Sequence, residues 1–159
     1  MYKQIQSKVY TKESARPKLE KYCAYQERSH KQVYEKCRML GLNEEESNEL
    51  LVELIRSNFL NEERFAKAYV KGKFNMKQWG KQKINQGLKL AGVHTQLIQE
   101  NLSKIEEDRY LQTIQKLAEK KMMSVKGSTD FEKKVKVHRY LISKGYSLHE
   151  IQKALNLDE

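Results

Sequence analysis

Apolar residues recur along the chain at the spacing of one helical face, and the same pattern appears three times. Three glycines, Gly41, Gly92 and Gly145, lie 51 and 53 residues apart. In every copy the residues eight and four positions before the glycine, and one and ten positions after it, are apolar. The residue six positions after it is apolar in two copies and is Ser47 in the first. Because residues four apart share a helical face, the pattern predicts a helix that ends at each glycine and a second helix after it.

Polar residues that favour helix starts follow these glycines. Asn43 and Ser147 each stand three residues before a glutamate, as in a capping box. The middle copy has no such pair, so its second helix must be capped by His94 or Thr95. The three copies are therefore expected to share one local structure, with the weakest helix start in the middle.

A further amphipathic segment precedes each helix pair. It contains Leu19 in the first copy, Phe65 and Tyr69 in the second, and Ile114 in the third. Pro17 is expected in the first turn of the first of these helices, where a proline is tolerated. Each copy thus predicts three helices.

The predicted fold is all-α, with three tandem three-helix repeats in an elongated, curved array. The expected divisions are a polar N-terminal arm at residues 1–15 and helical repeats at 16–58, 59–104 and 105–159. Hydrophobic residues make up only 38% of the chain, and the mean hydropathy is −0.86. Such a composition favours stacked small units over one thick core.

Charge is unevenly distributed along this array. The formal net charge is +10, and residues 64–99 contain eight lysines or arginines and no acid. The preceding residues 42–63 contain seven acids and one base. A surface helix normally mixes both signs, so the acid-free stretch favours an anionic partner such as nucleic acid. A solvated lysine-rich face is the alternative.

Two groups of basic residues are candidates for contact with a filament or nucleic acid. The first comprises Arg64, Lys67, Lys71, Lys73, Lys77, Lys81, Lys83 and Lys89. The second, which is diluted by three acids, comprises Lys120, Lys121, Lys126, Lys133, Lys134 and Lys136. Arg64 could equally pair with a neighbouring glutamate. Phe65 and Tyr69 are expected in the core, and Trp79 is expected to pack against a neighbouring helix rather than stack on a base.

No pattern typical of catalysis or metal binding is present. Cys23, His30 and Cys37 are three potential ligands without paired metal spacing, so no metal site is expected. The chain lacks a phosphate-binding glycine loop and a nucleophile at interpretable distance from a histidine. We therefore expect no enzymatic activity and no cofactor. The absence of a signal-type segment or a bilayer-spanning stretch favours the cytoplasm and argues against a membrane partner.

The helix–glycine–helix unit also has features of a helix-turn-helix, which makes a stand-alone DNA- or RNA-binding protein the alternative function. That motif needs an apolar residue five positions before the glycine, but this chain has Lys36, Gly87 and Tyr140 there. In addition, the acidic residues 44–46 at the start of the following helix would repel phosphate.

The middle repeat resembles the central motif of the RecX family. The resemblance is carried by residues 64–70 (RFAKAYV), residues 79–84 (WGKQKI), Leu88 and residues 92–93 (GV). The glycine turns of the first and third repeats resemble the corresponding family repeats, so the likeness covers nearly the whole chain. Two positions depart from the family pattern, because Asn61 stands where the family often has Asp, and Gly87 where it often has Glu.

The resemblance implies a small all-α regulator of the RecA recombinase, active in homologous recombination, DNA repair and the SOS response. Members of the family bind along the RecA–single-stranded-DNA filament and usually inhibit its recombinase, ATPase and co-protease activities. For this chain it implies the RecA filament as partner, with single-stranded DNA contacted directly or through the filament. We expect the protein to be a monomer.

Overall fold

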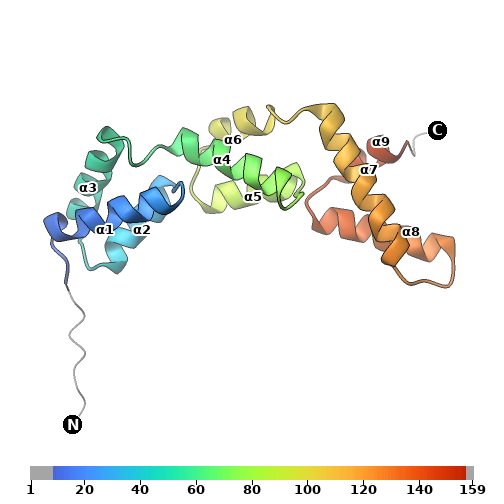
Figure 1. Ribbon diagram of the computed structural model, residues 1–159, viewed down its shortest axis with the longest axis horizontal. Helices are drawn as coiled ribbons and strands as arrows, with labels where there is room; N and C mark the ends of the chain where they lie inside the picture. The colour runs from blue at the N-terminus through green and yellow to red at the C-terminus, as the bar shows by residue number, and fades with distance from the viewer. Residues whose placement is uncertain (1–8, 157–159) are drawn as a thin grey trace, which may run out of the picture. The chain divides into compact units, whose positions relative to one another are not determined.

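A computed structural model describes residues 9–156 of the chain (Figure 1). Within these residues it contains nine helices and no strand, which confirms the all-α prediction. The helices are α1 (Lys12–Tyr25), α2 (His30–Met39), α3 (Glu44–Arg56), α4 (Glu62–Asn75), α5 (Lys81–Leu90), α6 (Thr95–Leu102), α7 (Glu107–Ser124), α8 (Asp130–Ser143) and α9 (Leu148–Leu155). The predicted repeat boundaries at 58/59 and 104/105 fall in the connections before α4 and α7.

The first helix begins earlier than the sequence predicts. Residues 1–8 of the predicted polar arm, 1–15, lie outside the described residues, but α1 already starts at Lys12. The start is fixed by a capping box in which Thr11 and Ser14 exchange side-chain and backbone hydrogen bonds. Pro17 therefore lies inside α1, and its predicted place in the first turn was wrong.

The three glycine turns have the predicted left-handed conformation. The φ angles are +91°, +80° and +102° at Gly41, Gly92 and Gly145. The N–H of Gly41 donates to the Arg38 carbonyl at 3.0 Å, and the N–H of Leu42 donates to the Cys37 carbonyl at 3.1 Å. The equivalent pair of bonds forms at Gly145. This is the Schellman arrangement, which satisfies carbonyls at a helix end and turns the next residue into the core.

The predicted helix starts after these turns are also confirmed. Asn43 and Ser147 each form a full capping box with the glutamate three residues later. In the middle repeat His94 is the cap, because its Nδ1 accepts the N–H of Gln96 at 3.2 Å. This start has one cap bond where the other two have a reciprocal pair.

The described chain divides into two compact units. The first extends to Ala68 and includes Ala91–Val93, and the second comprises Tyr69–Leu90 and the chain from His94 on. In the first unit α1, α2 and α3 pack on one another. Their shared core consists of Ala15, Leu19, Cys23, Val33, Cys37, Leu42, Leu50, Leu54 and Leu60. Val33, Cys37 and Leu42 are predicted positions, but Leu51, ten residues after Gly41, is only partly buried. In α3 the core is formed by Leu50 and Leu54 instead.

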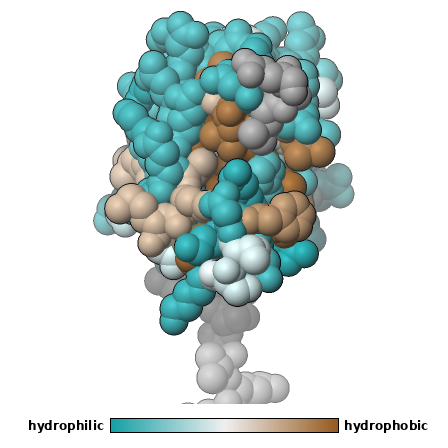
Figure 2. Space-filling model, turned by 90° about the vertical axis from the view of Figure 1, so that its right-hand side faces the viewer, coloured by the Kyte–Doolittle hydropathy of each residue, from teal (hydrophilic) through white to brown (hydrophobic). Residues whose placement is uncertain are grey.

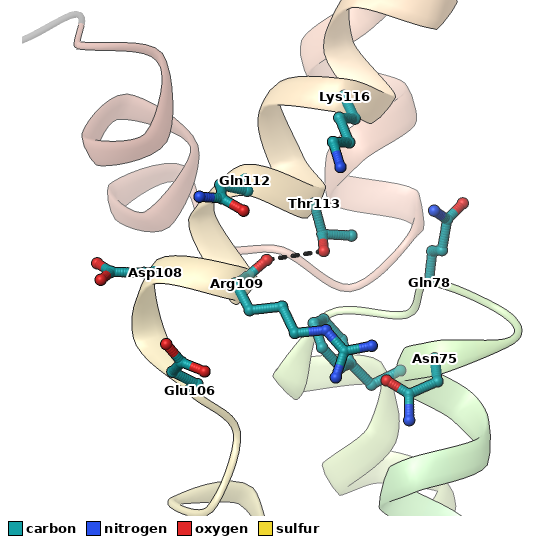
Figure 3. Close-up of a pocket in the computed structure, with 9 residues that line it drawn as sticks. Asn75, Gln78, Glu106, Asp108, Arg109, Gln112, Thr113 and Lys116 are labelled. Atoms are coloured by element: carbon teal, nitrogen blue, oxygen red, sulfur yellow. Dashed lines mark hydrogen bonds between the residues drawn. The ribbon is translucent and has the colours of Figure 1, made fainter.

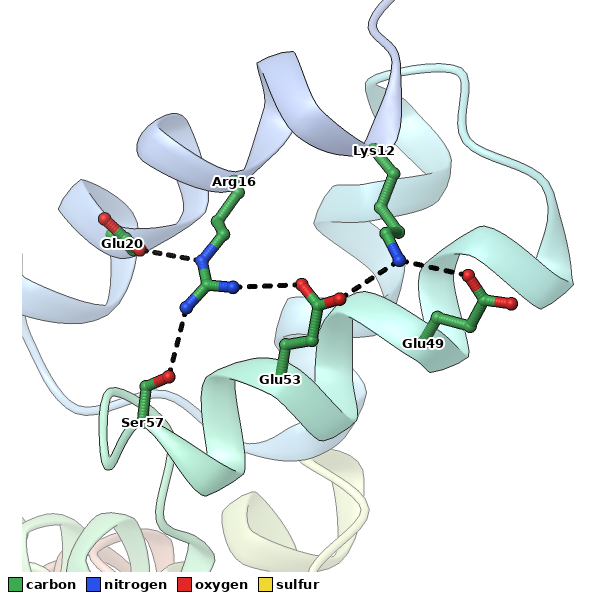
Figure 4. Close-up of polar contacts among 6 residues, drawn as sticks. All are labelled: Lys12, Arg16, Glu20, Glu49, Glu53 and Ser57. Atoms are coloured by element: carbon green, nitrogen blue, oxygen red, sulfur yellow. Dashed lines mark hydrogen bonds and ion pairs between the residues drawn. The ribbon is translucent and has the colours of Figure 1, made fainter.

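A network of ion pairs joins α1 and α3 in the first unit (Figure 4). Glu53 of α3 accepts Lys12 at 3.0 Å and Arg16 at 3.1 Å, both from α1. Lys12 also contacts Glu49 at 3.2 Å, and Arg16 donates to the Ser57 hydroxyl at 3.1 Å. The hydrogen bond from Lys12 lowers the pKa of Glu53. Acids of α3 thus neutralise bases of α1.

In the second unit α7, α8 and α9 pack on one another, and α5 packs on α6 (Figure 1). The Tyr110 ring lies 5.8 Å from that of Phe74 and 5.4 Å from that of Tyr146, centroid to centroid. Aliphatic side chains such as Ile114 and Leu141 are fully buried in this unit. On the face shown in Figure 2, hydrophobic residues form small areas that hydrophilic residues interrupt.

Candidate anion-binding site

The lysines of the first basic group lack acidic partners. Among residues 9–156, none of the seven lysines from Lys67 to Lys89 forms an ion pair. This contrasts with the paired charges of α1 and α3. The local sequence provides a reason, since residues 64–99 contain no carboxylate.

Arg64, the remaining member of the group, has a structural role. Its Nε donates to Glu27 at 2.6 Å, and its two terminal nitrogens donate to the side chain and carbonyl of Asn58 at 3.1 Å. A further bond reaches the Phe59 carbonyl at 3.3 Å. The partner is therefore Glu27 of the first repeat rather than one of the two neighbouring glutamates. Arg64 thus links the start of α4 to the α3–α4 connection, and the nitrogens of its guanidinium group all donate hydrogen bonds within the protein.

Two lysines of the second unit lie over the ring of Trp79. The ammonium nitrogen of Lys73, from α4, is 4.7 Å from the ring centroid, and that of Lys83, from α5, is 4.6 Å from it. Both distances fall within the range of cation–π attraction. Trp79 is half-buried in the connection between these helices. The sequence predicts that Trp79 packs against a neighbouring helix. The structure shows a feature that this prediction does not include, because two lysine ammonium groups lie over the Trp79 ring.

A third lysine, Lys144, joins this cluster from the α8–α9 turn. Its ammonium donates to the Lys77 carbonyl at 2.7 Å, and Lys83 lies 3.5 Å from the carbonyl of Ser143. Burial lowers the pKa of Lys144, and the charges of Lys83 and Lys77 lower it further. Sequence reasoning missed Lys144, although it directly precedes the third glycine of the repeat.

The backbone beneath the cluster is tightly packed. A side-chain carbon added to Gly80 would overlap the carbonyl group of Gly145, and one added to Gly145 would overlap Lys83. Gly80 donates its N–H to the Lys144 carbonyl at 2.8 Å. The N–H of Lys81 donates to the Tyr110 hydroxyl at 2.9 Å. Protein groups therefore occupy the N–H donors at the start of α5, and an anion here must bind to side chains.

The other lysines of the first group are more dispersed. Lys81 is half-buried, with its ammonium 4.8 Å from the Tyr110 ring centroid. Lys71, Lys77 and Lys89 are exposed on the second unit, and Lys67 is exposed on the first. The structure brings Lys73 and Lys83 together at Trp79 and does not place the remaining members against them.

The second basic group is partly neutralised within the protein. Lys134 pairs with Asp130 at 3.1 Å, and Lys136 donates to the Lys126 carbonyl. Lys121 lies 4.7 Å from the ring centroid of Tyr140. Lys120 is exposed on α7 and Lys133 is half-buried on α8. This group offers fewer free cations than the first.

The aromatic residues of the central motif divide between core and surface. Phe65 is buried, as predicted, and Tyr69 is half-buried. Burial raises the pKa of the Tyr69 hydroxyl. A side-chain carbon on Gly87 would overlap that hydroxyl, so a glutamate could not stand at this position without displacing Tyr69. Asn61 accepts the N–H of Arg64 at 2.9 Å and caps α4, a role that Asp would also fill.

A surface pocket of about 460 Å³ lies between α4 and α7 in the second unit (Figure 3). Its lining includes Glu106, Asp108, Arg109 and Lys116, so its charges are mixed. The Thr113 hydroxyl in this lining donates to the Arg109 carbonyl at 2.8 Å.

The cysteines do not form a metal site with other residues. Cys23 and Cys37 are free and buried, and burial raises the pKa of Cys23 and raises that of Cys37 to about 11. No group of three or more potential ligands occurs between residues 9 and 156. In the same part of the chain, no helix has the length and apolar character needed to cross a bilayer.

Two family models match the chain over most of its second and third repeats. The RecX second three-helix domain matches residues 61–102, and the RecX third three-helix domain matches residues 107–155. The chain belongs to the RecX family. The resemblance carried by the central motif is thereby confirmed, as are the tandem three-helix repeats.

Other RecX proteins extend this relationship. "Regulatory protein RecX" of Clostridium botulinum (strain Eklund 17B / Type B) is 33% identical over 121 residues, which are 75% of this chain and 56% of the relative. That of Clostridium acetobutylicum is 34% identical over 123 residues, covering 72% and 56%. The chain thus spans little more than half the length of these RecX proteins. The crystal structure of RecX from Lactobacillus salivarius shares the fold, with a TM-score of 0.82, 23% identity and coverage of 92% and 95%.

Proposed function

We propose that the chain is a non-enzymatic regulator that binds the RecA–single-stranded-DNA filament and modulates, usually inhibits, its recombinase, ATPase and co-protease activities. Membership of a family of regulatory proteins supports a regulatory role. The observation that supports the filament assignment is the group of unpaired lysines on the second unit, two of which lie over Trp79. The protein acts as a monomer in the cytoplasm and uses no cofactor.

The chemistry of the lysines suits such a filament. Because these ammonium groups form no ion pair with a carboxylate of residues 9–156, no such ion pair has to break before an anion binds. A strand of nucleic acid presents closely spaced phosphates, and binding to them is independent of sequence and weakened by salt. Acidic patches of a protein filament would be attracted by the same surface.

Titration of the purified protein into a DNA-dependent ATPase assay of the cognate RecA tests the proposal. We expect ATP turnover to fall with increasing protein and the protein to co-sediment with the filament. A DNA-free sample measures sedimentation without filament and serves as the control. Unchanged turnover together with no co-sedimentation would reject the proposal.

A second measurement separates filament binding from stand-alone DNA or RNA recognition. In the absence of RecA, we expect duplex binding to be weak and nearly uniform across sequences. A helix-turn-helix reader would instead lose about 1–3 kcal/mol for each mismatched base pair. The acidic first turn of α3, with Glu44, Glu45 and Glu46, is unsuited to entering a groove lined by phosphates.

A further inference from the structure

We propose that Lys73 and Lys83, whose ammonium groups lie over Trp79, and Lys144 of the adjoining α8–α9 turn form a binding site for a phosphate of a single nucleic-acid strand. The inference rests on the proposed function and names the place within the second unit where a strand would be held. All four residues belong to that unit, and they come from α4, the α4–α5 connection, α5 and the α8–α9 turn.

The tryptophan ring limits the separation of two of the cations. Because the ammonium groups of Lys73 and Lys83 lie 4.7 and 4.6 Å from one ring centroid, they can be no further apart than the sum of these distances. Under this proposal, a phosphate at the edge of the ring accepts from one or both of these ammonium groups. Two charge-assisted hydrogen bonds to one anion are stronger than contacts to scattered lysines.

The ammonium groups retain donors for such a ligand. Each lysine has three N–H donors, and one of Lys144 is used by the Lys77 carbonyl. Lys83 has a long contact of 3.5 Å to the Ser143 carbonyl. No carboxylate forms an ion pair with any of the three lysines among residues 9–156. The positive charge of the cluster is therefore uncompensated by protein groups.

The contacts that hold the three lysines bring like charges close to one another. One ammonium over the ring would be enough for a cation–π contact, whereas additional like charges repel one another. That repulsion is visible in Lys144, whose pKa is lowered by burial and then by the charges of Lys83 and Lys77. The negative charge of a bound phosphate would attract the three ammonium groups and so offset the repulsion between them.

The site is also fixed before any ligand binds. The close approach of Gly80 and Gly145 sets the α8–α9 turn against the first turn of α5. Lys83 and Lys144 therefore project from backbone segments that are joined by hydrogen bonds. A preformed site loses less conformational entropy on binding than one assembled from mobile loops.

Trp79 provides a local reporter, since it is the single tryptophan of the chain. The protein is titrated at low salt, without recombinase, with a single-stranded oligothymidylate carrying a fluorescent label. Tryptophan emission reports on the site, and anisotropy of the label reports on total binding. We expect a saturable change in emission that follows the anisotropy, and about a tenfold loss of affinity in Lys83→Gln.

Lys104→Gln is the matched control, because it removes the same charge from an exposed position of the second unit that belongs to neither basic group. We expect its affinity to fall by less than about twofold. Lys73→Gln, from a different helix, should repeat the effect of Lys83→Gln, and thermal unfolding of each variant shows that the fold is retained. Equal losses in Lys83→Gln and Lys104→Gln would overturn the site, as would strand binding without any change in emission.

Two further measurements identify the ligand and keep the proposals separate. Inorganic phosphate at the same phosphate concentration should leave the emission unchanged, and an equal response would overturn the assignment to a strand. Co-sedimentation with the RecA filament tests the proposed function independently. Oligonucleotide binding through the cluster without filament binding would reject the proposed function alone, whereas filament binding with no response at Trp79 would reject the site alone.

Discussion

At the scale of single residues, three glycines of the second unit meet different surroundings. Gly72 lies in α4, and a side-chain carbon there would meet nothing within 4 Å. Gly80 abuts the backbone of Gly145, and Gly145 has a φ of +102° and abuts Lys83. The same substitution, glycine to alanine, should therefore have effects of opposite sign at Gly72 and at the other two positions.

We expect Gly72→Ala to raise the free energy of unfolding by about 1 kcal/mol, because alanine is the better helix former. Gly80→Ala should lower it by about 1–3 kcal/mol through overlap with the turn. Gly145→Ala should lower it further, since left-handed strain of about 1–2 kcal/mol adds to the overlap with Lys83. Thermal unfolding of the three variants measures the order. Equal destabilisation by all three would contradict the packing described for the α5 start.

The ion pairs of Glu53 lead to a prediction about pH. The pKa of the Glu53 carboxyl lies below its usual value. The largest cause is the hydrogen bond from Lys12, and Arg16 lowers the pKa further. A lowered folded-state pKa gives stability that is present above the unfolded pKa, about 4.3, and is lost as the pH falls through the folded value. We expect Glu53→Gln to lower the unfolding temperature at pH 7 and to match the parent protein in strong acid.

Glu45→Gln, on the same helix, is the comparison for this experiment, because Glu45 forms no ion pair in the part of the chain that the structure describes. Its unfolding temperature should differ less from that of the parent at pH 7. A difference for Glu53→Gln that persists unchanged from pH 7 to strong acid would show that lost packing, not charge, is responsible.

At the scale of elements, periodicity predicted the repeat well because each glycine turn depends on local sequence. The residues before Gly41 and Gly145 both close a helix through the same two backbone bonds, and the capping boxes after them need only two side chains. The start of α1 was less predictable. Thr11 and Ser14 are a weaker signal than a proline, and the proline indicated a later start.

The candidate site was predictable only in part. The lysines of residues 64–99 stand out because no acid interrupts them. The grouping of Lys73 and Lys83 over Trp79 depends on how α4, α5 and their connection fold back on one another. Lys144 is 61 positions after Lys83 in the sequence and joins the cluster through tertiary packing, so no local pattern could indicate it.

The hydrogen bond between the start of α5 and Tyr110 of α7 leads to a stability prediction. Its buried hydroxyl accepts the N–H of Lys81 at the helix start. Tyr110→Phe removes that acceptor, and we expect a loss of about 1–3 kcal/mol, typical of a buried donor left without a partner. Tyr140→Phe is the control, since its ring faces the Lys121 ammonium and its hydroxyl has no hydrogen bond in residues 9–156. Similar losses in both variants would assign the effect to the ring environment instead.

At the scale of the whole molecule, charge is compensated in one place and left free in another. The acids of α3 pair with Lys12 and Arg16 in the first unit, whereas the second unit carries unpaired lysines. A uniform distribution of the same residues would serve solubility equally well. The separation places the attraction for polyanions on the second unit, and under the proposed function the filament would be bound there.

This separation predicts how binding to the RecA filament depends on salt. Replacing Lys71, Lys77 and Lys89 by glutamine removes three exposed cations of the second unit and leaves Lys73, Lys83 and Lys144 in place. Each lost phosphate contact should reduce the slope of log affinity against log salt by about 0.7. We therefore expect weaker filament binding and a slope shallower by up to about 2, measured by co-sedimentation over a range of salt.

The second basic group supplies the matched comparison. Replacing Lys120, Lys134 and Lys136 by glutamine removes the same charge, but Lys134 is paired with Asp130 and Lys136 with a backbone carbonyl. Groups already engaged within the protein contribute less to binding a phosphate, so this variant should keep most of the parent's slope. If both triple variants lose the same affinity, net charge alone governs binding. If only the second loses affinity, the filament contacts α7 and α8 rather than the surface of α4 and α5.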